Sequence, residues 1–539
     1  MESTERACCI VTVSASFSDQ KPLSCSGVIL NPQAGIVLCS GLLFSRFMNT
    51  KASVSSDLRF LPPDIFNDNL KICLNYSEQR DLETNQCAYE ACTVADSPSS
   101  HPLQATAELL FLINCVEFRK AFLKMFRGSD TWGFYGGEEE AEMVRDSEFL
   151  SWFAVLKAPG LKPGVSKSGP IPMVNSSSLR KGCPVLACGS PFGDLCPDLF
   201  MSTLSKGIIS NLAGEENVII LTDARCLPGT EGGGLFIRNG DQAYLAGLIV
   251  SPLCWKASEL IGLTLVCSLQ LILKNIMRCM KIHDPMGDIH LQQELTDFES
   301  RSQTWAIQRY PTVALVDSGQ FWGSGILVSP QLVLTCRHVV NGKSVVTLKF
   351  DSNDRYNDVM GDVLYSTKDS SPYDVAIVQL RDPTVEAVMP RLATSFQLAS
   401  LGVHVRPPPG EDVVVVGYGA LGQRCGGPSL TRGILSRAVS RCSETIMLQT
   451  TCAVQAGTSG GAVVRVSSGE LLGLVSSNTR DFAAKVTYPH LNFSIPVTVL
   501  QPLLRRYAQT GDVGLFRALD ETEEGVRRVW RLQAPQSKL

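Results

Sequence analysis

The stretch GSGILVSPQLVLTCRHVV, residues 323–340, decides the fold of this chain. Two short runs rich in β-branched and aliphatic residues flank a Ser-Pro turn and lead directly into a histidine. Further runs of this kind, among them SVVTLKF, VAIVQL, VVVVGYG and LNFSIPV, follow between about Thr304 and Ala508. Short strands separated by turn signals are typical of an all-β sandwich or a pair of barrels, and not of βαβ units. We therefore expect an all-β second half.

Three positions in this half carry residues suited to nucleophilic catalysis. His338 follows an apolar strand, Asp374 opens the strand VAIVQL, and Ser459 lies within the glycine-rich stretch GTSGG. A serine hydroxyl becomes a good nucleophile only when an imidazole takes its proton, and a buried carboxylate fixes the tautomer of that imidazole. The glycines allow a tight turn that directs backbone N–H groups, here those of Gly457 and Ser459, at a developing oxyanion.

Each of these residues has an ordinary structural explanation when it is taken alone. A lone histidine after a strand is usually a satisfied interior or surface residue, an aspartate before a strand is often a turn residue, and GTSGG could be a simple turn. The order His, Asp, Ser on an all-β background makes them support one another, because one of only six histidines falls where that order requires it.

The segments GSGILVSPQLVLTCRHVV, DVAIVQL and QAGTSGGAVV resemble the trypsin-like serine proteases, specifically their HtrA/DegP branch. By this resemblance His338 is the general base, Asp374 its orienting partner and Ser459 the nucleophile. The resemblance also implies the double β-barrel fold of that family and a reaction that needs neither a cofactor nor a metal.

The first half of the chain repeats the second. SGVILNPQAGIVLCSGLL, from Ser26, aligns with SGILVSPQLVLTCRHVV, and LPGTEGGGLFIRNG aligns with QAGTSGGAVVRVSS. In this alignment Leu42 replaces His338, Trp152 replaces Asp374 and Glu231 replaces Ser459. We therefore expect two tandem trypsin-like double β-barrel copies, the first of them degenerate and kept for packing, substrate binding or regulation.

The repeat and the composition of the connecting segments predict the domain boundaries. Residues 1–285 form the degenerate copy with a long insertion at about 45–150, and residues 286–303 form a linker. Residues 304–510 form the active protease domain, and 511–539 form a charged, partly ordered tail. The insertion contains TNQCAYEACTVADSPSSHPLQAT, whose polar composition predicts an exposed loop where proteolytic nicking concentrates, or simply a tolerated insertion.

The composition argues against several other classes of function. The net charge of −4 and the absence of a basic stripe give no reason to expect nucleic-acid binding. The 19 cysteines form no CxxC motif or Cys/His cluster, so we expect no zinc site and mostly reduced, buried thiols. The N-terminus lacks the pattern of a signal peptide, and no apolar run is long enough for a membrane span.

The chain ends in Ser537, Lys538 and Leu539, which match a receptor-read peroxisomal address. With this ending and the degenerate copy, the whole chain resembles a family of peroxisomal proteases that remove N-terminal leaders. The resemblance implies a matrix location, an import receptor that binds the SKL ending, and imported β-oxidation enzymes such as thiolase and acyl-CoA oxidase as substrates. It also implies self-processing next to a cysteine, and self-association remains open. The candidates for the self-cleavage site are Cys87, Cys92 and, ranked last because it lies in an apolar run, Cys115.

Two other functions remain as alternatives, a broad HtrA-like quality-control protease and a non-catalytic binding or chaperone module. The specificity pocket is expected to be lined by residues 451–456 and by the SSN segment after Leu474. Because neither segment contains an acidic residue, a basic residue before the scissile bond is disfavoured, and a small pocket suits cysteine or an aliphatic side chain.

Overall fold

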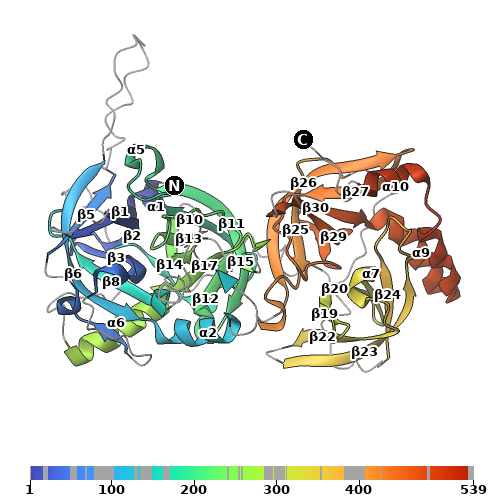
Figure 1. Cartoon of the computed structure of the whole chain (residues 1–539), viewed down its shortest axis with the longest axis horizontal. Coiled ribbons are helices and arrows are strands. Elements are labelled where there is room, and N and C mark those ends of the chain that lie inside the picture. The colour runs from blue at the N-terminus through green and yellow to red at the C-terminus, as the bar shows by residue number, and fades with distance from the viewer. Residues whose placement is uncertain are drawn as a thin grey trace, which may run out of the picture.

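The fold is built from two β-rich units that lie side by side, the first coloured blue to green and the second yellow to red in Figure 1. The structure is a computed structural model of the 539-residue chain. It describes residues 2–15, 22–48, 58–66, 69–77, 102–126, 132–133, 148–161, 170–239, 242–252, 255–256, 259–283, 295–296, 310, 312–352, 355–381, 407–424, 427–481 and 486–531.

The first unit contains two closed barrels of six strands each. The pairing of β6 with β8 closes the first barrel, and the pairing of β13 with β14 closes the second. The strands of the first barrel are β1 (Cys8–Ala15), β2 (Leu23–Asn31), β3 (Ile36–Ser40), β5 (Leu70–Tyr76), β6 (Leu103–Asn114) and β8 (Trp152–Lys157). Those of the second are β10 (Pro184–Gly189), β11 (Thr203–Ala213), β12 (Ile219–Thr222), β13 (Gly234–Asn239), β14 (Gln242–Ser251) and β17 (Thr264–Ser268).

Short strands extend these barrels at their edges. A two-residue strand, β4 (Phe60–Leu61), pairs with β6, while β9 (Met173–Val174) pairs in parallel with both β14 and β18 (Leu295–Thr296). A separate three-stranded sheet joins β7 (Trp132–Gly133), β15 (Trp255–Lys256) and β16 (Glu259–Leu260).

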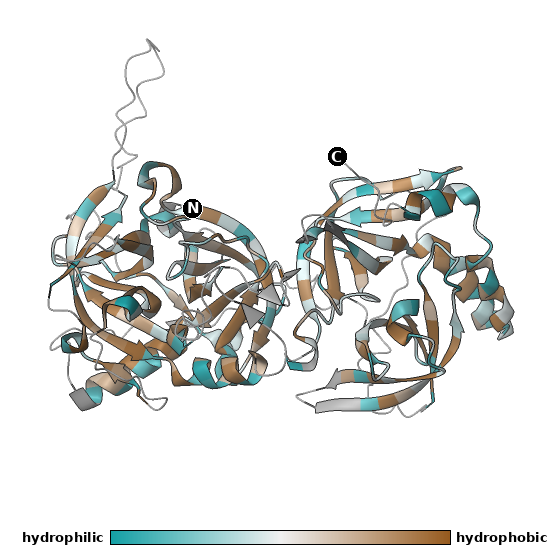
Figure 2. Ribbon diagram, viewed as in Figure 1, coloured by the Kyte–Doolittle hydropathy of each residue, from teal (hydrophilic) through white to brown (hydrophobic). Residues whose placement is uncertain are grey.

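The second unit repeats this architecture with two closed six-stranded barrels, which confirms the expected pair of trypsin-like double barrels. The first barrel comprises β19 (Val313–Asp317), β20 (Trp322–Ser329), β21 (Leu332–Thr335), β22 (Val345–Ser352), β23 (Arg355–Ser366) and β24 (Ala376–Leu380). The second comprises β25 (Asp412–Gly417), β26 (Ser429–Arg441), β27 (Glu444–Thr450), β28 (Ala462–Arg465), β29 (Leu471–Asp481) and β30 (Val486–Pro496). Figure 2 shows hydrophobic stretches along the strands of both units, as expected for barrels that bury their interiors.

Helices lie between and after the strands. They are α1 (Glu2–Arg6), α2 (Val116–Phe126), α5 (Pro197–Phe200), α6 (Leu269–His283), α7 (Arg337–Val340), α9 (Val497–Thr510) and α10 (Glu524–Trp530). Short 3-10 turns are η1 (Gly41–Phe47), η2 (Pro63–Ile65), η4 (Ser176–Ser178), η5 (Glu215–Asn217), η7 (Gly422–Arg424) and η8 (Val513–Leu519). Within the described residues, no helix has the length and apolar character that a membrane crossing needs.

The two units meet where β11 of the first lies against β26 of the second (Figure 1). Asn211 Nδ2 donates to Ser429 Oγ at 2.9 Å, and the backbone N–H of Arg432 donates to Asp223 Oδ2 at 2.5 Å. The other oxygen of Asp223 accepts from the backbone N–H of Ile208 in its own unit at 2.7 Å. Burial raises the pKa of Asp223 to about 6, and the bonds from these N–H groups oppose that shift.

Three segments outside the repeated motifs, namely 45–150, 286–303 and 511–539, contain regular structure that the sequence did not predict. β5 and β6 lie within the range 45–150, yet they are two of the six strands of a barrel, so that range is not one insertion. β18, within the expected linker, pairs with the first unit. Residues 511–531 of the expected tail form η8 and α10, whose buried side chains join the core of the second unit. The motif alignment could not detect β5 and β6 because their residues differ from those of β22 and β23.

Candidate active site

His338 and Asp374 are brought together by neighbouring strands. β21, whose residues are all buried, runs directly into the short helix α7 that carries His338. β21 pairs with β24, and Thr335 faces Ala376 in that register. Asp374 therefore lies just before β24, beside the start of α7, and the sequence spacing of 36 residues becomes a direct contact.

Both carboxylate oxygens of Asp374 contact His338. His338 Nδ1 lies 2.5 Å from Asp374 Oδ2, and the backbone N–H of His338 donates to Asp374 Oδ1 at 3.1 Å. Burial by itself raises the pKa of Asp374, but the hydrogen bonds and charge of His338, with the nearby Arg337 guanidinium, outweigh it and hold that pKa below its ordinary value. Asp374 is therefore ionised, and its hydrogen bond to Nδ1 fixes the orientation of the His338 imidazole.

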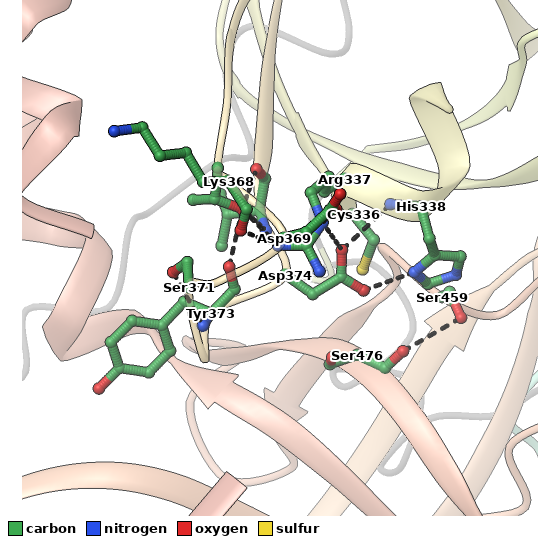
Figure 3. A network of polar contacts seen from close by, with 12 residues as sticks. Cys336, Arg337, His338, Lys368, Asp369, Ser371, Tyr373, Asp374, Ser459 and Ser476 are labelled. Carbon is green, nitrogen blue, oxygen red and sulfur yellow. Dashed lines mark hydrogen bonds and ion pairs between the residues drawn. The ribbon is translucent and has the colours of Figure 1, made fainter. Parts of the chain in front are cut away.

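Ser459 lies beside His338 on the side of the imidazole away from Asp374 (Figure 3). It sits in the turn between β27 and β28, and its hydroxyl donates to the carbonyl oxygen of Ser476 at 3.3 Å. Its own carbonyl oxygen accepts from the backbone N–H of Ser324 at 2.8 Å, which fixes the turn against β20. The arrangement brings a hydroxyl, an imidazole and a carboxylate into one place, in the order that proton transfer needs.

The turn before Ser459 needs glycine. Gly457 has a φ of +89°, and a Cβ at this position would lie 2.2 Å from the ring of Trp322. The carbonyl oxygen of Gly457 accepts from Ser324 Oγ at 2.8 Å, and Thr458 N donates to the carbonyl oxygen of Gln455 at 3.0 Å. These bonds hold the peptide units on which an oxyanion hole from the N–H groups of Gly457 and Ser459 depends.

A cleft of about 700 Å³ opens over these residues. Its walls include residues 476–478 and, of the predicted segment 451–456, residues 454–456. The sequence reasoning missed a further wall, formed by Arg527 and Trp530 of α10 and by Arg531 directly after it. Val526 and Trp530, buried at helical spacing within a polar stretch, are the signal that could have revealed α10.

A cation could in principle be held here, because ligand atoms of Cys336, His338 and Asp374 lie within 4.8 Å of one another. However, Cys336 is fully buried, and burial raises the pKa of its thiol well above the ordinary value. The thiolate that a metal would bind is therefore unfavourable, and its sulfur already faces the carbonyl oxygen of Val475 at 3.2 Å. The donor set fits a protease site better than a metal centre.

The corresponding positions of the first unit hold other residues. Cys39 pairs with Ala154 as Thr335 pairs with Ala376, so the residue two places before Ala154, Trp152, occupies the position of Asp374. Leu42 follows Cys39 at the spacing at which His338 follows Thr335.

The nucleophile position of the first unit holds Glu231. The backbone N–H of Ser26 donates to the carbonyl oxygen of Glu231 at 2.9 Å, as that of Ser324 does to Ser459. The carboxylate of Glu231 accepts from the backbone N–H of Gly229 at 2.7 Å. The first unit thus has the same turn as the second, with a carboxyl side chain where the second unit has the Ser459 hydroxyl.

The remaining predicted residues fall in two groups. Cys115 is 0% exposed, and its backbone N–H donates to the carbonyl oxygen of Ser151 at 2.9 Å. The folded chain therefore does not present the bond after Cys115 to a protease. Cys87, Cys92 and the three C-terminal residues Ser537, Lys538 and Leu539 lie outside the described residues.

Comparison with known proteins gives matches of three kinds: a family model, two relatives and a solved structure. A family model described as "Trypsin-like peptidase domain" matches residues 323–474. The chain is 40% identical to the "Peroxisomal leader peptide-processing protease" of Mus musculus and 39% identical to that of Homo sapiens. Each alignment covers 100% of this chain and 98% or 99% of the relative. Among solved structures, a serine endoprotease from Yersinia pestis matches with a TM-score of 0.30 and 22% identity over 40% of this chain and 69% of its own.

Proposed function

The chain belongs to the family of peroxisomal leader peptide-processing proteases, trypsin-like serine proteases, and from this premise we propose that it is an endopeptidase of the peroxisomal matrix. It removes N-terminal targeting leaders from imported enzymes. The observation that carries the proposal is the His338–Asp374 contact at 2.5 Å, in a cleft that also contains Ser459.

The reaction follows from these three side chains. His338 takes the proton of Ser459 Oγ as that oxygen attacks the scissile carbonyl carbon, and Asp374 stabilises the imidazolium that forms. The N–H groups of Gly457 and Ser459 bind the oxyanion of the tetrahedral intermediate. The imidazolium then gives its proton to the leaving amine, and water, activated by the same imidazole, hydrolyses the acyl-enzyme. No cofactor takes part.

The substrates and partners follow from the family and from the cleft. The lack of an acidic residue in 451–456 and 476–478 favours a small or aliphatic residue, including cysteine, before the scissile bond. Matrix enzymes of β-oxidation that carry N-terminal leaders are the proposed substrates. The peroxisomal import receptor is the proposed partner of Ser537, Lys538 and Leu539.

The two units have different proposed roles. Residues 304–510, together with the packed residues 511–531, form the active protease domain. The first unit, which β18 joins, is a pseudoprotease because leucine, tryptophan and glutamate take the positions of the triad. The protease also processes itself after Cys87 or Cys92, and the burial of Cys115 argues against cleavage there.

Replacing the nucleophile tests this function. Wild type and Ser459→Ala are compared on a matrix enzyme with its leader and on denatured casein, with intact mass and N-terminal sequencing of both substrate and protease. We expect Ser459→Ala to lower kcat by a factor of about 10³–10⁶ and to leave the protease itself uncut. Glu231→Gln, at the matching position of the first unit, serves as the control and retains full activity. Equal processing by wild type and Ser459→Ala would contradict the proposal, and preferential casein cleavage would favour a broad quality-control protease.

A further inference from the structure

The chain beyond α9 returns to the active site. We call residues 511–531 the C-terminal clamp and residues 367–373, which lie between β23 and Asp374, the aspartate loop. Four side chains of the clamp are buried in the core of the second unit: Phe516, Leu519, Val526 and Trp530. The clamp therefore is a packed part of the protease unit, and the elements it packs against decide what it does.

Asp520 connects the clamp to the end of β23 and to the start of the aspartate loop. Its Oδ1 accepts from the backbone N–H of Lys368 at 2.8 Å, and its Oδ2 accepts from the hydroxyl of Tyr365 at 2.5 Å. Burial and the charge of Asp520 both raise the pKa of Tyr365, so this phenol stays protonated and keeps donating. The carboxylate thus holds the last residues of β23 and the first residues of the loop in one position.

Two further contacts with the clamp, made by Ser371 and by Tyr373, anchor the rest of the aspartate loop. Ser371 Oγ donates to the carbonyl oxygen of Leu519 at 2.7 Å and accepts from the backbone N–H of Tyr373 at 3.2 Å. The rings of Tyr373 and Trp530 meet edge to face with centroids 6.0 Å apart, and Trp530 Nε1 donates to the carbonyl oxygen of Ile446 at 3.2 Å. Tyr373 immediately precedes Asp374, so the clamp reaches the residue next to the catalytic carboxylate.

The opposite side of the loop is bonded to α7. Arg337 donates to the carbonyl oxygen of Lys368 at 2.5 Å, and Figure 3 shows the loop curving around Asp374 from Lys368 through Ser371 to Tyr373. The loop is therefore held between α7, which carries His338, and the clamp. Catalytic groups need placement within about 0.5 Å, and an error of about 1 Å can lower a rate by about 10².

We propose that the C-terminal clamp, through Asp520, is a positioning device that holds the aspartate loop and thereby keeps the Asp374 carboxylate on the imidazole of His338. The proposal rests on the proposed endopeptidase function and adds a positioning residue to it. Asp520 is not one of the residues that line the cleft, so it acts only through the loop. It should therefore affect the chemical step and its pH dependence far more than substrate binding.

The test compares Asp520→Asn with Asp512→Asn in the full-length protein. Asp512 belongs to the same clamp but only caps η8, where its side chain accepts from the backbone N–H of Gly514 at 2.8 Å. Asparagine can still cap there, so Asp512→Asn controls for general effects on the clamp. Tyr365→Phe keeps its ring contact with Phe516 and removes one bond to Asp520, and it provides a milder variant if Asp520→Asn lowers the yield of folded protein.

The readouts are kcat and KM on a leader peptide, the pH profile of kcat/KM and titration of competent sites with a fluorophosphonate. We expect Asp520→Asn to lower kcat per competent site by about 10-fold or more with KM within about twofold, and Tyr365→Phe to act in the same direction with a smaller effect. The acidic limb of the profile should move to lower pH, because a less well-placed carboxylate stabilises the imidazolium less. Mere loss of folded protein would lower the number of competent sites without moving that limb.

Equal kcat and an equal acidic limb for Asp520→Asn and Asp512→Asn would overturn the proposal. If wild type were no more active than Ser459→Ala, the proposed function would fail, and the clamp would then be tested by the far-downfield proton resonance of the His338–Asp374 hydrogen bond. Loss or displacement of this resonance in Asp520→Asn alone would support the positioning role. An unchanged resonance in both variants would overturn it.

Discussion

The turns that contain Glu231 and Ser459 share one backbone arrangement but differ in the side chain that each carries. In both units a serine from the first barrel supports the turn in the second: Ser26 Oγ donates to the carbonyl oxygen of Gly229 and Ser324 Oγ to that of Gly457, each at 2.8 Å. Both glycines have a φ in the left-handed region, +96° and +89°. The backbone of the turn is therefore independent of the residue at the nucleophile position.

The difference lies in what occupies the N–H groups of the turn. In the second unit the N–H of Gly457 is the proposed donor to a substrate oxyanion. In the first unit the equivalent N–H, that of Gly229, is bonded to the carboxylate of Glu231 at 2.7 Å. The first unit therefore has a carboxyl group in place of the Ser459 hydroxyl, and this group occupies the N–H that corresponds to the proposed oxyanion donor. Restoring a serine alone would not restore a protease, because Leu42 and Trp152 supply neither a base nor its partner.

The largest difference between the two turns is expected when Gly457 and Gly229 are each replaced by alanine and the loss of activity is compared. In Gly457→Ala the new Cβ would lie 2.2 Å from the ring of Trp322, so the turn must shift and its N–H groups move away from the oxyanion. We expect kcat to fall by about 10²–10³, the effect of losing an oxyanion-hole donor. Peptide hydrolysis per folded molecule measures this effect.

Gly229→Ala is the matched change in the first unit. Its Cβ would lie 2.5 Å from the backbone nitrogens of Phe192 and Gly193, so it strains its turn to a similar degree. We expect a loss of about 1–3 kcal/mol in stability without a change in kcat. A comparable fall in kcat for both variants would mean that the first turn is coupled to catalysis, and the contrast drawn between the two units would be wrong.

A second, smaller effect concerns the pH dependence of stability. Burial raises the pKa of Glu231 to about 7, although the N–H groups of Gly229 and of Glu231 itself oppose that shift. The folded chain therefore holds a proton that the unfolded chain, with the ordinary carboxyl pKa, has already released. Between the two pKa values the free energy of unfolding falls as pH rises, by about 3 kcal/mol in total.

Glu231→Gln removes this titration and can keep the hydrogen bond to Gly229. The stability of the variant relative to wild type should therefore rise by up to about 3 kcal/mol between pH 4.5 and pH 8, measured by denaturant unfolding at each pH. Asp223, which also has a raised pKa, is present in both proteins and cancels in the difference. A difference that does not change with pH would show that Glu231 is not protonated in the folded chain near neutral pH.

The sequence predicted those parts of the molecule whose conformation is determined by a short local motif. The proposed triad residues and the glycine turn each lie in a short stretch whose pattern repeats between the two halves. The clamp could not be predicted in the same way. The bond between Asp520 and Lys368 joins residues far apart in the sequence, and nothing in the polar stretch around Asp520 indicates which loop it meets. β5 and β6 escaped detection because barrel strands tolerate many apolar residues, so their sequences diverged without loss of the fold.

The smallest expected effect tests how the two units are joined. Asn211 of β11 is fully buried, and its amide donates to Ser429 Oγ of β26 at 2.9 Å, so it links the unit that contains Glu231 to the unit that contains Ser459. A double-mutant cycle with Asn211→Ala and Ser429→Ala should give a coupling energy of about 1 kcal/mol in unfolding, the usual value for one buried neutral hydrogen bond. Neither residue contacts the cleft, so kcat should stay the same in all three variants. A coupling energy near zero would mean that the bond adds nothing to the joint between the units. A fall in kcat that exceeds the loss of folded protein would instead show that the joint transmits strain to the active unit, and the first unit would then have to be treated as part of the catalytic machinery.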